Sequence, residues 1–208
     1  MALEATHIRF ALDLQKKYEP TDLRKYVSGA IYPDSRYVTG IDRHLTHLDR
    51  LTREKLLSSG DFGKGWHAHL VCDDIQYEVT KELLPEVFKE KSAFGKETWI
   101  RHSALKVLQD MGDVRRFDIA NYLASLDYIE NPNGEDTAVL QTYNKIFQKM
   151  YVAPATLTLN EYYDMWREWK IGDDFSGQIR RQAEEYAKDE RVMKLVSKIY
   201  AEVLGRTL

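Results

Sequence analysis

The residues best suited to chemistry are histidines and aspartates concentrated in the first third of the chain. Five of the six histidines lie within the first 69 of 208 residues. His69 and Asp73 are four positions apart in a segment with helical character, so their side chains project from one face. A neutral imidazole and a carboxylate in this arrangement can bind one divalent cation such as zinc. This spacing predicts a metal site in the front half of the chain.

Three further side chains from other segments are candidates for the same site. Asp34 follows Pro33 in an apolar loop, where a carboxylate often serves function. His7 and His47 lie among apolar residues, and a buried neutral histidine needs a partner that fixes its tautomer. Taken singly, each is also explained as a hydrogen-bonded core or turn residue. Together they predict a site for zinc, manganese or iron, with one or two ions held by His7, Asp34, His47, His69 and Asp73.

Several other polar or aromatic residues have simpler expected roles. A solvated, surface or core position accounts for His44, His67, Cys72, Asp74 and His102. Asp74 has a second interpretation as a general base. Aromatic residues of the second half are expected to pack in a core, with a ligand pocket as the alternative; they are Tyr162, Tyr163, Trp166 and Trp169.

Composition limits the partners and the compartment. Net charge is −3 and the isoelectric point is about 6.1, so we expect no stable binding to duplex nucleic acid. A small phosphate-containing substrate bound through metal stays compatible with this charge. No apolar run approaches the roughly 18 residues of a membrane span, and the first residues do not resemble a secretory signal. With a single cysteine, the chain is expected to be cytoplasmic, and no oligomeric state is predicted.

Helix-forming residues dominate and β-branched runs are short, which predicts an all-α fold. We expect one domain over residues 1–208, with a metal-site half at about 1–85 and a helical packing half at about 86–208. Helices are predicted at 5–18, 21–27, 44–47, 62–84, 97–111, 114–129, 136–150, 159–169 and 173–204, with a loop at 30–40. Asp22, Asp61 and Asp136 are the expected N-caps. The helices of His7 and His69 should pack centrally, with the last helix outside.

The order of four short motifs resembles a known family. They are Thr6-His7, Gly29-Ala30-Ile31-x-Pro33-Asp34, Thr46-His47 and Gly65-Trp66-x-x-His69-x-x-x-Asp73. Over residues 5–75 this set is similar to the zinc-dependent phospholipase C superfamily, which includes fungal single-strand-specific nucleases. The resemblance implies an all-helical fold in which Asp34, His47, His69 and Asp73 surround one zinc. It also implies that His7 holds a second metal, bridged by Asp73, and that Asp34 orients the attacking water.

The chain also departs from that family. Secreted members begin with a tryptophan whose amine and carbonyl bind metal, whereas this chain has Met1-Ala2. Removal of Met1 would free the Ala2 amine as a substitute ligand. After Asp73 the only histidine is His102, and Lys106 stands four residues later where the family has an acid. We therefore expect a mononuclear or dinuclear site, or a degenerate one, without the third zinc.

These observations predict a metal-dependent hydrolase of a phosphodiester or phospholipid-like substrate, which uses a metal-activated water. The first alternative is a non-catalytic member that binds phosphate, with the Lys106 ammonium in place of a metal charge. The second is an HD-domain-like phosphohydrolase, which needs a contiguous His-Asp pair that the sequence lacks.

Overall fold

The computed structural model describes residues 2–88, 96–169 and 171–208, which contain helices and no strand. The prediction of an all-α fold is confirmed. The α-helices are α1 (Glu4–Asp13), α2 (Gln15–Tyr18), α3 (Leu23–Ile31), α4 (Arg36–Thr39), α5 (Arg43–Thr46), α6 (Arg50–Arg53), α7 (Asp61–Leu83), α8 (Lys96–Arg116), α9 (Thr137–Tyr151), α10 (Leu159–Glu168), α11 (Asp173–Lys188) and α12 (Glu190–Thr207). Shorter 3₁₀ turns cover Tyr32–Ser35, Glu54–Ser58, Pro85–Phe88, Ile119–Asp127 and Pro154–Thr156. None of the described helices combines the length and apolar character needed to cross a bilayer.

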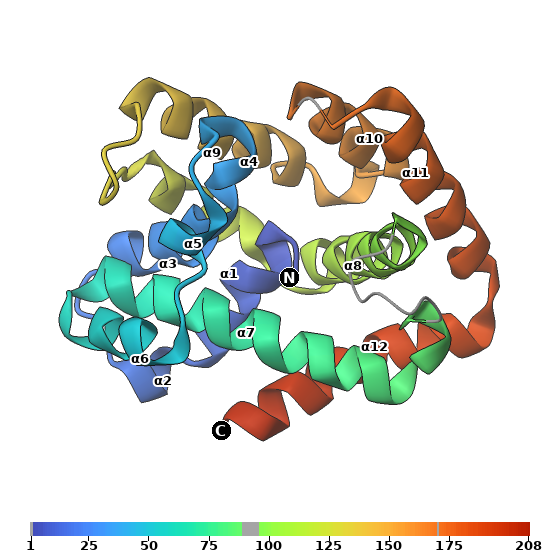
Figure 1. Cartoon of the computed structure of the whole chain (residues 1–208), viewed down its shortest axis with the longest axis horizontal. Helices are drawn as coiled ribbons and strands as arrows, with labels where there is room; N and C mark the ends of the chain where they lie inside the picture. Colours follow the sequence, from blue (N-terminus) through green and yellow to red (C-terminus); the bar gives the residue numbers. More distant parts are fainter. Residues whose placement is uncertain (1, 89–95, 170) are drawn as a thin grey trace.

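Helix α1 lies in the middle of the molecule and carries His7. It contacts α3, α7 and α8 and lies near the centre of Figure 1. Helix α12 runs along the outer side of α7, in agreement with the prediction that the last helix lies outside the central helices. Because the first half of α1 is enclosed, its polar residues Glu4, Thr6 and His7 are buried, and Glu4 has no exposed surface. The apolar core therefore continues directly into the polar cluster described below.

Two glycines let α3 and α7 approach with their backbones almost in contact. A Cβ atom added to Gly65 would lie 1.9 Å from the carbonyl oxygen of Tyr26, and one added to Gly29 would lie 2.0 Å from that of Phe62. No side chain fits at either position. The close approach brings the end of α3, which leads to Asp34, against the part of α7 that carries His69.

The predicted loop over residues 30–40 is wrong. Helix α3 passes into a 3₁₀ turn over Tyr32–Ser35 and then into α4, so the chain stays helical up to Thr39. Pro33 is compatible with this helical path, because it occupies a first-turn position of the 3₁₀ segment, where its missing N–H costs nothing. Asp34 is consequently held on a helical turn.

Other boundaries differ from the predictions for local reasons. Helix α8 continues through Gly112, which lacks the positive φ of a helix-ending glycine. Asp61 does not cap α7, since Gly60 takes that position and the Asp61 carboxylate accepts hydrogen bonds from Thr21 and Asp22. Most of residues 114–129 lies in the end of α8 and a 3₁₀ turn. The final predicted helix is broken at Asp189, which is extended and caps α12. Asp22 and Asp136 cap as predicted.

Candidate metal site

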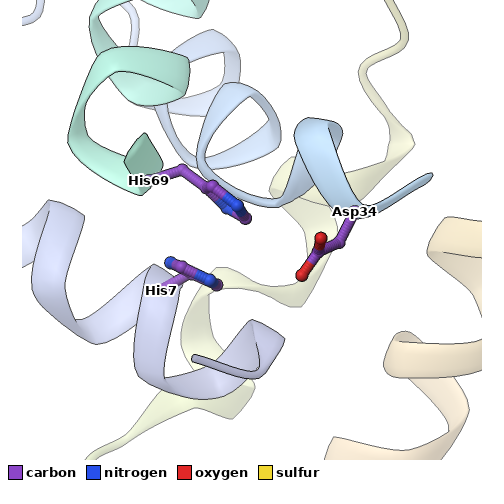
Figure 2. Close-up of side chains that lie close together, drawn as sticks. All are labelled: His7, Asp34 and His69. Atoms are coloured by element: carbon purple, nitrogen blue, oxygen red, sulfur yellow. The ribbon is translucent and has the colours of Figure 1, made fainter. Parts of the chain in front are cut away.

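The structure brings all five predicted ligands into one buried cluster. Ligand atoms of His7, Asp34 and His69 lie within 4.8 Å of one another, and so do those of His47, His69 and Asp73. His69 belongs to both groups. Figure 2 shows His7 and His69 side by side with their rings directed toward the Asp34 carboxylate. Every one of the five side chains is at most 7% exposed.

Four separate elements supply these residues. Helix α1 carries His7, the 3₁₀ turn after α3 carries Asp34, and the residue that ends α5 is His47. Helix α7 carries both His69 and Asp73, four residues apart on one face as their spacing predicts. The cluster therefore depends on tertiary packing between segments, mainly on the contact between α3 and α7.

Hydrogen bonds on the far side of two imidazoles orient them toward the cluster. His69 Nδ1 lies 2.8 Å from the Ala30 carbonyl oxygen, to which a protonated Nδ1 donates. His47 Nδ1 lies 3.0 Å from the hydroxyl of Thr46. The carbonyl partner leaves Nε2 of His69 as its lone-pair atom, and the same holds for His47 when its Nδ1 donates to the Thr46 hydroxyl; both Nε2 atoms face carboxylates. This is the arrangement by which proteins fix the tautomer of a metal-binding histidine.

The spacing between ligand atoms fits a shared cation. The Nε2 atoms of His47, His7 and His69 lie 3.4, 3.5 and 3.7 Å from a carboxylate oxygen of Asp73. His47 Nε2 is also 3.6 Å from Asp34 Oδ1. These distances exceed those of good hydrogen bonds. Two ligands at zinc bonding distance in a tetrahedral site are separated by about 3.3–3.5 Å. The donor set of imidazole nitrogens and carboxylate oxygens therefore fits zinc or a similar divalent ion.

His7 differs from the other two histidines because neither ring nitrogen has a hydrogen-bond partner among the described residues. Its ring stacks on that of His69, with centroids 3.6 Å apart and planes inclined by 16°. Burial lowers the pKa of His7 well below its usual value, and the neighbouring imidazole of His69 lowers it further, because the two rings cannot easily both be protonated. Burial lowers the pKa of His69 as well. Both imidazoles are thus neutral, which is the form that coordinates metal.

Asp73 is the acceptor at the centre of the cluster. Burial alone would raise its pKa, but the groups beside the carboxylate, including the imidazoles of His69 and His7, hold this pKa well below the usual value. The Ala2 backbone N–H donates a hydrogen bond of 2.9 Å to Asp73 Oδ1. Asp73 is therefore ionised and suited to bind a cation. The sequence analysis considered removal of Met1, which would free the Ala2 amine; Met1 lies outside the described residues.

Lys106 places a second kind of positive charge beside the site. It is 5% exposed and lines a small cavity together with Asp34 and Ala2. Burial lowers the pKa of Lys106 to about 8, although Asp73 and Asp34 oppose the shift. His102, one turn earlier on α8, is also buried, and burial lowers its pKa well below the usual value. The lysine noted in the sequence as a departure from the family thus faces the same region as the ligands.

A pocket of about 660 Å³ opens onto the cluster at His47 and Asp73. Its walls carry both aromatic and basic side chains, among them Tyr77, Trp99, His102, Arg36, Arg43 and Arg53. A small molecule in this pocket would lie beside His47 and Asp73. Sequence reasoning missed the arginines, although their positions were a signal, since Arg36 follows Asp34 by two residues and Arg43 precedes His47 by four.

The remaining candidates lie outside the ligand cluster. His44 is exposed, as predicted, and Cys72 is buried. His67 faces another side of α7, where its Nδ1 lies 2.7 Å from the hydroxyl of Tyr18. Asp74 is exposed and pairs with Arg53, with 2.6 Å between Oδ2 and the guanidinium. Of the aromatic residues considered for a pocket, Tyr162, Trp166 and Trp169 are buried in the core, and Tyr163 is half-buried.

A buried carboxylate on α8, Asp110, supports the first turn of α1. Asp110 on α8 accepts hydrogen bonds from the hydroxyls of Tyr151 and Tyr162, at 2.8 and 2.7 Å, and from the Thr6 backbone N–H at 3.1 Å. Burial raises the pKa of Asp110 to about 7. These bonds fix the first turn of α1, and with it the position of His7.

Comparisons with family models, curated proteins and solved structures give no match to this chain. The likeness to the phospholipase C superfamily therefore stays a prediction, and a functional argument depends on the geometry of the cluster.

Proposed function

We propose that the chain is a metal-dependent hydrolase of a small phosphate ester. The observation that carries this proposal is the convergence of three imidazoles and two carboxylates, from four elements, in a buried cluster that opens onto a pocket. Zinc is the ion that this donor set favours, and manganese or iron would also fit. His47, His69, Asp73 and Asp34 would hold one ion, and His7 would contribute to a second. This assignment agrees with the motif resemblance.

The side chains divide the work of hydrolysis between them. A bound divalent ion supplies a water of lowered pKa and neutralises charge on the phosphoryl oxygens. Asp34 has a buried oxygen, Oδ1, with no hydrogen-bond partner among the described residues. Asp34 would orient the attacking water and accept its proton. The Lys106 ammonium, on the same side as Asp34, would attract the phosphate and stabilise charge that develops during the attack.

The proposal is tested by assaying protein purified without chelator. The substrates are para-nitrophenyl phosphate and its bis ester, with zinc or manganese added. We expect hydrolysis that EDTA abolishes and that added metal restores. Asp34→Asn should lower kcat by about two to four orders of magnitude, the range of a general base. His44→Ala, an exposed histidine between the ligand segments, is the matched control and should retain activity. Activity that survives complete metal removal would refute the proposal.

A binding protein without catalysis is the second candidate. It is favoured by two contacts that lower the need for metal: the Ala2 N–H on Asp73 and the buried Lys106 beside Asp34. In this case phosphate would bind through the lysine, and no ester would be cleaved under any metal condition. Phosphate affinity unchanged by EDTA and lost in Lys106→Met identifies this alternative.

A further inference from the structure

The pocket beside the metal site has a basic wall that the hydrolysis of a simple ester does not use. Arg36 is the first residue of α4 and Arg43 the first of α5, so both lie on the segment that joins Asp34 to His47. The predicted ligands His47 and Asp73 line the same pocket as the two arginines. A ligand in this pocket that reaches His47 and Asp73 therefore lies beside both guanidinium groups.

These two arginines differ from the third one in the pocket. Arg53 has partners of its own, because it pairs with Asp74 and also donates to the Leu70 carbonyl oxygen at 3.5 Å. Neither Arg36 nor Arg43 forms an ion pair with a described carboxylate. The Nε atom of Arg36 is buried and has no hydrogen-bond partner among the described residues.

An aromatic ring restricts the orientation of the Arg36 side chain. Its guanidinium carbon lies 4.1 Å from the centre of the Tyr37 ring, a cation–π contact that restricts the side chain. The Tyr37 ring in turn stacks on Trp169, with centroids 5.3 Å apart and planes inclined by 3°. A guanidinium held in this way keeps its hydrogen-bond donors available for a planar or tetrahedral anion.

The charges of the pocket indicate what these donors would bind. Of its acids, Asp73 is a proposed metal ligand, Asp74 is paired with Arg53, and Glu78 is exposed. A divalent ion would compensate the charge of Asp34 and Asp73. The positive charges of Arg36 and Arg43 would then remain without a protein counterion, beside a phosphate already held at the metal.

We infer that Arg36 and Arg43 form a second anion subsite and that the substrate is a phosphate ester with a further phosphate or carboxylate group. The inference rests on the proposed function, since it takes the metal cluster as the site of the first phosphate. Guanidinium groups bind both of these anions through charge-assisted hydrogen bonds. Such a subsite would make the chain selective for doubly anionic esters over esters with one charge.

Binding of phosphonates, which cannot be hydrolysed, tests the subsite. The protein is loaded with one equivalent of zinc and freed of excess metal. It is then titrated calorimetrically with alkane diphosphonates of two to six carbons and with the matching monophosphonates. At the chain length that spans both sites, we expect the diphosphonate to bind at least about tenfold more tightly than the monophosphonate, because it adds charge-assisted hydrogen bonds.

The variant Arg36→Gln/Arg43→Gln should lose this preference while it keeps its affinity for the monophosphonate. Arg24→Gln/Arg181→Gln is the control, since it removes the same charge at exposed positions outside the pocket. A preference retained in the first variant, or lost equally in the control, would overturn the inference. If zinc-dependent monophosphonate binding occurs and no diphosphonate binds more tightly, the subsite is refuted and the proposed function stands. If no phosphonate binds to the zinc-loaded protein, both fail.

Discussion

Replacing Gly65 with alanine should destabilise the protein, although the same change normally stabilises a helix. Gly65 lies inside α7, where alanine has a better intrinsic helix propensity by about 1 kcal/mol. The new Cβ atom would, however, lie 1.9 Å from the Tyr26 carbonyl oxygen and 2.9 Å from the Ala30 backbone nitrogen. Both neighbours are backbone atoms of α3, so neither can rotate away. Relief requires the two helices to separate.

The size of the effect follows from these two opposing contributions. Overpacking of a well-packed interior costs about 1–3 kcal/mol, and a clash with backbone belongs at the upper end. After subtraction of the gain in propensity, we expect Gly65→Ala to lower the free energy of unfolding by about 2 kcal/mol. Separation of the helices would also lengthen the bond between His69 Nδ1 and the Ala30 carbonyl oxygen, now 2.8 Å. Metal affinity should fall together with stability.

Gly112→Ala is the matched control. Gly112 also lies inside a long helix, α8, but nothing is within 4 Å of the position that its Cβ atom would take. This substitution should raise the free energy of unfolding by about 0.5–1 kcal/mol. Equilibrium denaturation in guanidinium chloride, followed by circular dichroism with zinc removed, measures both values. A Gly65→Ala variant as stable as wild type would refute the close approach of α3 and α7.

Three further predictions concern the buried charges and the metal. The pKa of Asp110, raised by burial to about 7, lies above the roughly 3.9 of an unfolded chain, so the native state retains a proton that the unfolded state releases. Wild type should therefore lose stability relative to Asp110→Asn as the pH rises from about 4 to about 8, and a constant difference across denaturation curves would contradict this. Lys106→Met should lower kcat for phosphate esters by at least about tenfold, as expected for loss of a charge near the developing anion, with zinc content by elemental analysis unchanged; an unaltered kcat argues against a role for the ammonium. Zinc at about one hundred times its Kd should stabilise chelator-treated protein by about 2.7 kcal/mol and raise its Tm by about 5–10 °C in differential scanning calorimetry. Magnesium prefers oxygen ligands and should leave the Tm nearly unchanged.

Local signals in the sequence identified most helices and the residues that form the His/Asp cluster. The four-residue spacing of His69 and Asp73 required only a helix, and the caps at Asp22 and Asp136 were visible from residue type. The sequence did not reveal the contacts between segments that lie far apart along the chain. The sequence predicts a loop around Pro33 and a helix that ends at residue 111, whereas Pro33 lies in a 3₁₀ turn and Gly112 lies inside α8. The basic wall at Arg36 and Arg43 was missed because single arginines carry no pattern until a pocket brings them together.

The five ligand candidates were predicted from their types and neighbours, whereas their mutual distances depend on how α1, α3 and α7 pack. Gly29 and Gly65 were noticed as parts of motifs, but the reason for glycine at each position is the backbone of the facing helix. In the same way, the orientation of His69 depends on a carbonyl oxygen 39 positions earlier in the chain. Contacts of this kind have no sequence periodicity.

The central claim is that the His/Asp cluster binds a divalent metal ion, and elemental analysis tests it most directly. Protein purified without chelator should contain at least about half an equivalent of zinc, manganese or iron, as its nitrogen and oxygen ligands favour these ions. His69→Ala and Asp73→Asn should lose most of this metal, and His44→Ala should keep it, with circular dichroism used to verify that each variant is folded. Two results would contradict the account. The first is equal metal content in wild type and in folded His69→Ala and Asp73→Asn variants. The second is a wild type that contains none of the three metals after purification and does not take up added zinc.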